Sequence, residues 1–338
     1  MPTERKLIAL LLLLLWSFQQ FLGAGNDKKT AAVHSTGSLN KKLPVENNDF
    51  IYKALGDFQS LTIPLKRAGK LILIDAMIDS VAGNLIFDTG SAGLVLNSIY
   101  FRSTRRSPLL ESGGITGAVA GVTKYYINQM QLSDVFYRNF EADMTDLGHL
   151  ERARNIKILG FFGLSVLEDF EVVLDLRNNL LELHRIDKKG KRINNLLAAP
   201  KFDVLLPMRN VSNVMFIEGE IGGKELLFCL DTGAESNVLS NRLPDKVLNT
   251  VSVSRRSTLW GVGSQKVDVF HGQMNNFSVG KHALQQMPTL ITSLSAMAHS
   301  FGISLDGMLG CDFFESGIFY IDQRNNKLGI EFYKTRIE

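Results

Sequence analysis

The most informative stretch for the fold is Phe87-Asp88-Thr89-Gly90-Ser91, because it recurs 143 positions later as Leu230-Asp231-Thr232-Gly233-Ala234. In both copies a β-type apolar run leads into Asp-Thr-Gly and an apolar pair follows it. A carboxylate at the end of a buried strand is costly unless it is hydrogen-bonded or functional, and the adjoining glycine lets another backbone come close. Because the motif occurs twice, we expect a site built from paired carboxylates.

The repeat extends well beyond the two motifs. Residues 61–97 align with residues 204–240 without a gap, and the eight identities lie mostly at strand, turn or motif positions. A later block aligns at a shift of 147 positions, where Gly160-Phe161-Phe162-Gly163 falls on Gly307-Met308-Leu309-Gly310. A repeat of this length that occurs only twice indicates two duplicated lobes and not a solenoid.

Short strand-like runs dominate both copies, so the predicted class is mainly β. Residues 61–65 and 71–78, with a turn between them, are typical of a hairpin, and helical patterns are confined to residues 146–153 and 284–300. A basic run at residues 188–192 indicates an exposed linker. The predicted organisation is an N-terminal lobe over residues 59–186, a linker over 187–201 and a C-terminal lobe over 202–338.

Each copy also carries a glycine-rich turn between its Asp-Thr-Gly and its later glycine block. The first turn covers residues 113–121 and includes Gly117; the second covers residues 259–264 and includes Trp260 and Gly261. Strand-like segments flank both turns, so each is expected to be the tip of a hairpin.

The N-terminus is typical of an exported protein. Arg5 and Lys6 precede an apolar run that begins at Leu7 and is shorter than the roughly 20 residues of a membrane-spanning helix, so residues 1–25 are predicted to be a signal peptide. An uncleaved signal that tethers the chain to the membrane is the alternative. Residues 26–58 are a mostly polar leader, which acts either as a pro-segment or as a plain tether. The predicted location is the periplasm or the medium.

Composition and motif spacing exclude several other functions. A net charge of +3 provides no strong field for nucleic acid. The six histidines are scattered without zinc-ligand spacing, and no Gly-x-Ser-x-Gly elbow is present, so neither metal nor cofactor is expected. Cys229 and Cys311 are the only cysteines, and we interpret them as two small buried thiols, with a single bridge as the alternative.

Two Asp-Thr-Gly motifs, each with a glycine-rich hairpin after it and an apolar-apolar-Gly element about 70 residues later, resemble the aspartic peptidases. The resemblance covers about residues 61–333. In this range the chain looks like two retroviral-peptidase-like lobes joined in one exported, bacterial-type chain. It implies two homologous acid-protease-like β-barrel lobes related by a pseudo-two-fold axis. Pepsin-like enzymes carry a tyrosine on the flap, whereas neither tip here does, so pepsin's flap contacts do not transfer.

The resemblance also assigns roles to residues. Asp88 and Asp231 would be the catalytic pair at the interface between the lobes. Thr89 and Thr232 would brace the two loops, and Gly90 and Gly233 would allow the loops to approach closely. The flap candidates would be Gly117, Trp260 and Gly261, and the two later glycine blocks would pack behind the aspartates.

Such a pair of carboxyls suits hydrolysis of a peptide bond. Two like charges about 3 Å apart share one proton, so one member acts as the base toward water while the other donates to the carbonyl oxygen. The expected function is therefore an aspartic endopeptidase that cleaves extended polypeptide segments. A peptide-binding protein that keeps the fold without cutting is the alternative. We expect a monomer. The alternative is a homodimer in which each lobe pairs with its equivalent in another chain.

Overall fold

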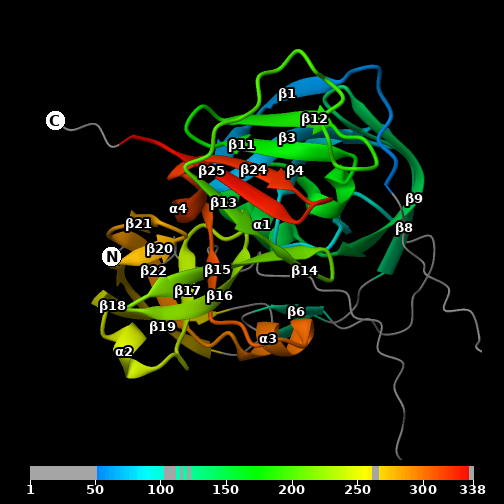
Figure 1. Cartoon of the computed structure of the whole chain (residues 1–338). Helices are drawn as coiled ribbons and strands as arrows, with labels where there is room; N and C mark the ends of the chain where they lie inside the picture. The colour runs from blue at the N-terminus through cyan, green and yellow to red at the C-terminus, as the bar shows by residue number, and fades with distance from the viewer. Residues whose placement is uncertain (1–51, 103–111, 115–116, 120–122, 261–265, 335–338) are drawn as a thin grey trace, which may run out of the picture.

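The computed structural model describes residues 52–102, 112–114, 117–119, 123–260 and 266–334. Strands dominate these ranges, and the few helices are short, so the predicted mainly β class is confirmed (Figure 1). Each copy of the repeat builds its own sheet, and a third sheet is shared between them. Within the described ranges, no helix is both long and apolar enough to cross a membrane.

The sheet of the first lobe closes into a barrel, because β3 pairs with β8 as well as with β4. The strand order is β2-β3-β4-β10-β5-β9-β8. Its strands are β2 (Lys66–Ala68), β3 (Leu71–Ile78), β4 (Val81–Phe87), β5 (Leu94–Asn97), β8 (Thr123–Leu132), β9 (Val135–Thr145) and β10 (Ile158–Phe162). The lobe also contains the small hairpin of β6 (Ser112–Gly114) and β7 (Gly117–Val119), the helix α1 (Gly148–Arg154) and the 3-10 turn η1 (Leu164–Leu167).

The second lobe repeats this plan as a half-barrel. The strand that corresponds to β8 is interrupted at Asn275-Asn276, where Asn276 is left-handed with φ of 56°, and β20 alone makes the pairing with β15. The strands are β14 (Arg209–Val211), β15 (Val214–Ile221), β16 (Lys224–Leu230), β17 (Asn237–Ser240), β18 (Val251–Trp260), β19 (Lys266–Met274), β20 (Phe277–Val279), β21 (His282–Leu284), β22 (Met287–Thr292) and β23 (Gly307–Leu309). The helices are α2 (Asp245–Leu248), α3 (Ser295–Phe301) and α4 (Cys311–Phe314).

A six-stranded sheet joins the lobes, with three strands from each. The order is β1-β12-β11-β24-β25-β13, formed by β1 (Ser60–Pro64), β11 (Phe170–Asp175), β12 (Leu180–Arg185), β13 (Val204–Pro207), β24 (Gly317–Asp322) and β25 (Lys327–Phe332). At its centre β11 pairs with β24, and Val173 lies opposite Tyr320. These two residues are equivalents in the repeat, 147 positions apart, so the pseudo-two-fold axis passes through this pair.

The core follows from the repeated apolar pattern. β3 (LILIDAMI) and β15 (VMFIEGEI) show the same burial sequence, with four buried residues followed by strict alternation. The first four face apolar neighbours on both sides, whereas the alternating end has one face in water. The largest cluster of buried side chains includes residues of both lobes, so the apolar core runs through the junction between them.

Two local predictions are wrong. The strand that forms a hairpin with β3 is β2, not residues 61–65, because β1 pairs instead with β12 in the shared sheet. The helical pattern over residues 284–300 holds only for α3, since Met287–Thr292 forms the strand β22. This strand is hydrogen-bonded on both sides, to β19 and to β17, and tertiary pairing of this kind overrides a helical period.

The predicted linker runs between β12 and β13. Residues 52–58, which the sequence assigns to the end of the leader, pack on the first lobe. Leu55 bridges to Phe136, and the ring of Phe58 stacks on Phe170. The predicted signal peptide, residues 1–25, and most of the leader lie outside the described residues.

Candidate active site

Each Asp-Thr-Gly begins where a buried strand ends. Asp88 follows β4 and donates its backbone N–H to Phe162 O at 3.0 Å; Asp231 follows β16 and donates to Leu309 O at the same distance. The acceptors belong to β10 and β23, each of which runs parallel to the strand before the aspartate and antiparallel to the strand after it. The two later glycine blocks therefore lie directly behind the aspartates.

Glycine is required in these blocks because backbones approach too closely for a side chain. A Cβ on Gly163 would lie 1.8 Å from Ser91 O, and one on Gly310 would lie 2.6 Å from Ala234 O. No real Cβ approaches backbone oxygen so closely. The spacing of glycines that marked the repeat is thus a packing requirement of the loops that carry the aspartates.

Thr89 and Thr232 bind across the junction in a reciprocal pattern. The N–H of Thr89 donates to the hydroxyl of Thr232, and the N–H of Thr232 donates to the hydroxyl of Thr89, both at 3.0 Å. The Thr89 hydroxyl in turn donates to Leu230 O at 2.9 Å, and the Thr232 hydroxyl donates to Phe87 O at 2.8 Å. Both side chains are fully buried, so these four bonds fix one loop on the other.

The same approach brings the two carboxyls together. A Cβ on Gly90 would lie 2.6 Å from Cγ of Asp231, and a Cβ on Gly233 would lie 2.6 Å from Cγ of Asp88. Oδ1 of Asp88 accepts from Gly90 N–H, and Oδ1 of Asp231 accepts from the N–H groups of Gly233 and Ala234. The Oδ2 atom of each carboxyl is buried and accepts no hydrogen bond from a backbone N–H or a donor side chain of the described residues.

Burial and mutual repulsion shift the protonation of the pair. The pKa of Asp88 is raised well above its usual range, first by burial and then by the charge of Asp231 and a hydrogen bond with it. Burial also raises the pKa of Asp231 to about 6, against the opposing effect of the Asp88 hydrogen bond and the backbone N–H groups. Because the two groups titrate together, the pair retains one proton at a pH where separate aspartates would have lost both.

The flap candidates lie in two hairpins. Gly117 begins β7, which pairs with β6 in the first lobe, and Trp260 ends β18, paired with Lys266 of β19. Gly261 lies outside the described residues. The β6 strand lies beside α3 of the second lobe, so this hairpin reaches across the junction (Figure 1).

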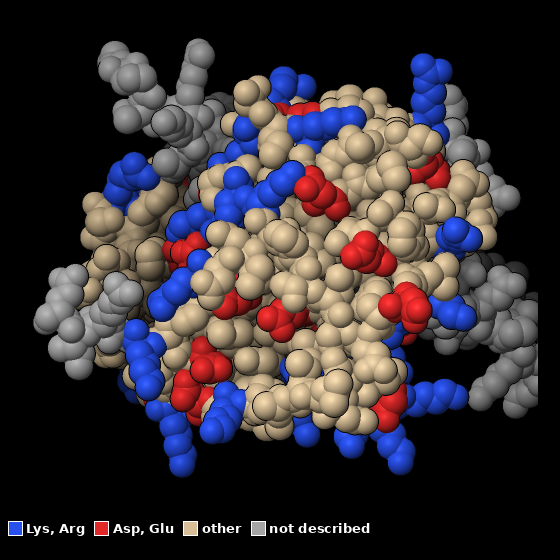
Figure 2. All heavy atoms as spheres, turned by 90° about the horizontal axis from the view of Figure 1, so that it is seen from above, with Lys and Arg blue, Asp and Glu red and all other residues tan. Residues whose placement is uncertain are grey.

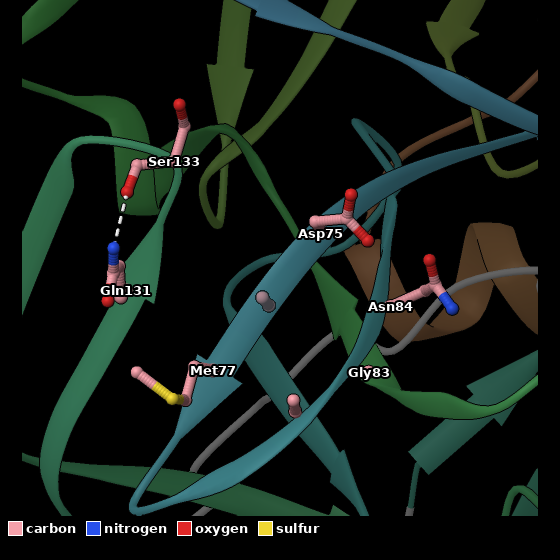
Figure 3. A pocket seen from close by; sticks show the side chains of 8 residues that line it. Asp75, Met77, Gly83, Asn84, Gln131 and Ser133 are labelled. Atoms are coloured by element: carbon pink, nitrogen blue, oxygen red, sulfur yellow. Dashed lines mark hydrogen bonds between the residues drawn. The ribbon is translucent and has the colours of Figure 1, made fainter.

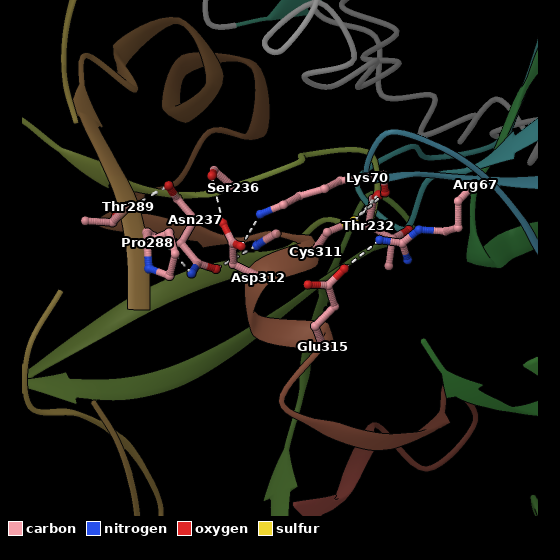
Figure 4. Close-up of polar contacts among 11 residues, drawn as sticks. Arg67, Lys70, Thr232, Ser236, Asn237, Pro288, Thr289, Cys311, Asp312 and Glu315 are labelled. Atoms are coloured by element: carbon pink, nitrogen blue, oxygen red, sulfur yellow. Dashed lines mark hydrogen bonds and ion pairs between the residues drawn. The ribbon is translucent and has the colours of Figure 1, made fainter. Parts of the chain in front are cut away.

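Ion pairs also join the two lobes, and no pattern in the sequence predicts them. In Figure 4 the β2–β3 turn of the first lobe meets α4 of the second, where Lys70 pairs with Asp312 and Arg67 with Glu315. Asp312 also accepts from Ser236 Oγ at 2.7 Å. The third pair joins Arg154 to Glu235, four positions after Asp231.

At the equivalent place in the first lobe the contacts are neutral. Ser165, which corresponds to Asp312, donates its hydroxyl to Ala92 O at 2.8 Å. The Tyr52 hydroxyl accepts from Leu94 N–H at 3.3 Å. The surroundings of the two aspartate loops therefore differ although the loops themselves are symmetric. The paired residues are up to 248 positions apart in the sequence. Contacts over such separations leave no periodic pattern, so these ion pairs could not be predicted from the sequence.

Both cysteines are free and buried. The Cys311 thiol donates to Thr232 O at 3.3 Å and to Lys70 O at 3.1 Å, and burial raises its pKa to about 12. Interpreting them as two buried thiols is therefore correct, and Cys311 packs directly behind the second aspartate loop.

A surface hollow of about 510 Å³ lies elsewhere, on the first lobe (Figure 3). It is formed by β3, β4 and the end of β8, and it is lined by Asp75, Ala76, Met77, Ala82, Gly83, Asn84, Gln131 and Ser133. The carboxyl pair is not part of it. In the described ranges no group of three His, Cys, Asp or Glu side chains is arranged to hold a metal ion.

Residues 217–313 match the family model described as an aspartyl protease. The resemblance to the aspartic peptidases is confirmed. The matched segment lies in the second lobe and contains both Asp231 and the Gly307–Gly310 block. Among solved structures the chain is similar to the aspartic proteinase from Irpex lacteus, at 12% identity and a TM-score of 0.47, over 81% of this chain and 98% of that one. No curated protein matches the sequence.

Proposed function

We propose that the chain is an aspartic endopeptidase whose single site is formed by Asp88 and Asp231. The observation that carries the proposal is the interaction of two fully buried carboxyls, each with a raised pKa and an Oδ2 atom that no backbone or side-chain donor reaches. A buried, unpaired carboxyl oxygen costs free energy, and a pair that shares one proton is suited to acid and base roles at once.

In the proposed reaction, water held by the two Oδ2 atoms attacks the carbonyl carbon of the scissile bond. The ionised member of the pair takes a proton from that water, while the protonated member donates its proton to the carbonyl oxygen. Collapse of the tetrahedral intermediate breaks the C–N bond, and the amine leaves with the proton that the base had taken. The shared proton is restored to the pair, so no metal or covalent nucleophile takes part.

The proposed substrate is an extended polypeptide segment. Support comes from the two hairpins, β6–β7 and β18–β19, which follow the two Asp-Thr-Gly motifs in the sequence. Within the described residues β6, β7 and β18 each pair with one strand only, which leaves one edge of each without a strand partner. An extended peptide binds such edges through main-chain hydrogen bonds, and alternate side chains then enter pockets.

We also propose that the active form is a monomer. Both motifs lie in one chain, and the Thr89–Thr232 bonds join them within it, which supports a complete site without a second copy. Sedimentation of the active species tests this, because activity confined to a dimer would contradict it.

Export to the periplasm or the medium is proposed from the basic and apolar N-terminus alone. N-terminal sequencing of protein recovered outside the cytoplasm tests it, and a chain that still begins at Met1 would support the tethered alternative.

Single substitutions at the pair test the enzymatic proposal. We expect Asp88→Asn and Asp231→Asn each to lower cleavage of a diverse peptide library by about 10²–10⁴-fold, and pepstatin to inhibit the unaltered protein. The matched control is Asp75→Asn, which replaces an exposed carboxyl paired with Lys66 and should leave cleavage unchanged.

The alternative, a non-catalytic peptide-binding protein, predicts retention of peptide on the unaltered protein with no cleavage at any pH between about 3 and 8. Full cleavage by either single variant would exclude the shared pair. The raised pKa of both carboxyls favours the enzyme, because peptide binding alone has no need of a shared proton.

A further inference from the structure

The linker between the lobes exposes apolar side chains together with basic ones. Within it Leu196 is 95% exposed, and Ile193 and Leu197 are each more than a third exposed. Just beyond it Phe202 is more than a third exposed, and Leu205 of β13 is 54% exposed. We call this set, with its exposed neighbours Lys188, Lys189, Lys191 and Lys201, the linker patch. Exposed leucines in a run of this kind are unusual for a surface that faces only water.

The linker is held in place just before Leu196. Ile193 N–H donates to Arg185 O at 2.9 Å, and the Asn194 side chain donates to Ser60 Oγ at 3.1 Å. Arg192 pairs with Glu171 of β11. These contacts fix the segment on β1, β11 and β12 immediately before Leu196, and the leucine projects outward from an anchored backbone.

The lysines of the patch have no carboxylate partner in the described chain. The two acids of the segment are engaged with backbone: Asp187 Oδ1 accepts from the N–H groups of Lys189 and Lys191, and Asp203 Oδ2 accepts from Phe332 N–H. None of the four lysines forms an ion pair with another described residue. The Asp187 carboxylate also attracts the charges of Lys189 and Lys191. With four lysines against two carboxylates, the patch combines a net positive charge with apolar surface.

The face of the molecule that carries β1 and β12 is the upper one in Figure 1, and Figure 2 looks onto it. Lys and Arg side chains lie mainly toward the edges of this face, and several separate Asp and Glu side chains lie within the area between them. The linker contacts β1 and β12 through Asn194 and Ile193, and therefore lies on this side of the molecule.

We propose that the linker patch docks the protein on an anionic lipid surface, with Leu196 and Leu197 entering the boundary between headgroups and acyl chains. Clustered lysines are attracted to anionic headgroups, and leucine side chains gain free energy when they leave water. A second copy of this chain fits the patch less well, because self-pairing would bring together two surfaces of the same net positive charge.

A fluorophore at the tip of the patch tests the proposal. Leu196→Cys in the full chain provides one reactive thiol, because Cys229 and Cys311 are buried, and it is labelled with an environment-sensitive dye. We expect a blue shift on addition of vesicles containing phosphatidylglycerol, little shift with phosphatidylcholine alone, and reversal at high salt. Val253→Cys, a site on β18 whose native side chain is 52% exposed, is the matched control and should show no shift.

Removal of the charges gives a second, quantitative measurement. Each Lys→Gln change at positions 188, 189, 191 or 201 should weaken vesicle binding roughly fivefold, while cleavage of a soluble peptide stays unchanged and verifies folding. Vesicle binding without a blue shift at position 196 would mean that the N-terminal segment alone holds the chain, and the proposal would be wrong. A blue shift that follows protein concentration without vesicles would assign the patch to a second copy instead.

Discussion

Thr89 and Thr232 each donate a backbone N–H to the other's hydroxyl at 3.0 Å, across a separation of 143 positions. Each hydroxyl then donates to the carbonyl of the residue before the partner's aspartate. The position of Asp88 is therefore fixed by the second lobe, and the position of Asp231 by the first. Neither loop retains its native geometry if the other is displaced.

Removal of either hydroxyl should destabilise the whole chain. Thr89→Val and Thr232→Val each abolish one acceptor and one donor and leave a buried N–H unpaired, so we expect a loss of about 2–4 kcal/mol in the free energy of unfolding. Urea denaturation measures it. Thr→Ser at the same positions keeps the hydroxyl and should cost much less; an equal loss in the serine variants would assign the effect to the methyl group.

Gly90→Ala should act through Asp231. The new Cβ would lie 2.6 Å from Cγ of that side chain, and relief of such overpacking costs about 1–3 kcal/mol and displaces a carboxyl of the pair. We expect peptidase activity to fall at least about tenfold, since misplacement by about 1 Å costs up to 10²-fold. In an Asp231→Ala background the contact is absent, so a double-mutant cycle should show the stability cost of Gly90→Ala reduced.

Stability should decline as the pH rises through the titration of the pair. A carboxyl whose pKa is raised by folding binds its proton more tightly in the native state, so its stabilising effect is complete below the unfolded pKa of about 4. The effect is then lost up to the folded pKa, about 6 for Asp231 and higher for Asp88. The loss should amount to about 3 kcal/mol for a shift of this size.

The double variant Asp88→Asn/Asp231→Asn lacks this titration. Urea denaturation of both proteins across about pH 4 to 8 should show the unaltered protein losing stability relative to the variant as the pH rises. Parallel curves would mean that the pair does not take up protons on folding. Peptidase activity should appear as the pair loses its first proton near pH 6 and fall again when the second is lost.

The ion pairs between the lobes should differ in strength according to their exposure. The Asp312 side chain is 6% exposed and also accepts from Ser236, whereas the Glu315 side chain is 41% exposed. We expect Asp312→Asn to lower the free energy of unfolding by about 1–3 kcal/mol and Glu315→Gln by less than about 1 kcal/mol. Denaturation at low and high salt separates them, because only the exposed pair is strongly screened; equal costs would contradict this ranking.

Much of the two-lobed architecture was predictable from the internal repeat in the sequence. The gapless alignment of residues 61–97 with 204–240 and the two later glycine blocks predicted duplicated lobes. Glycine is needed wherever two backbones approach closely, so the positions of the glycines mark these approaches in the sequence itself. Hairpin pairing was predicted less well. The composition of residues 61–65 predicts a strand but does not identify the strand with which it pairs. In the structure β1 pairs with residues 180–184.

That two equivalent carboxylates end two equivalent buried strands was predictable from the sequence, because the apolar pattern and the glycine spacing are properties of consecutive residues. The difference between the surroundings of the two aspartate loops became visible only in the folded chain. One aspartate loop rests on ion pairs from Lys70, Arg67 and Arg154, and the other on neutral contacts from Tyr52 and Ser165. Such contacts depend on which surfaces meet when the lobes share a sheet, and no local pattern encodes that meeting.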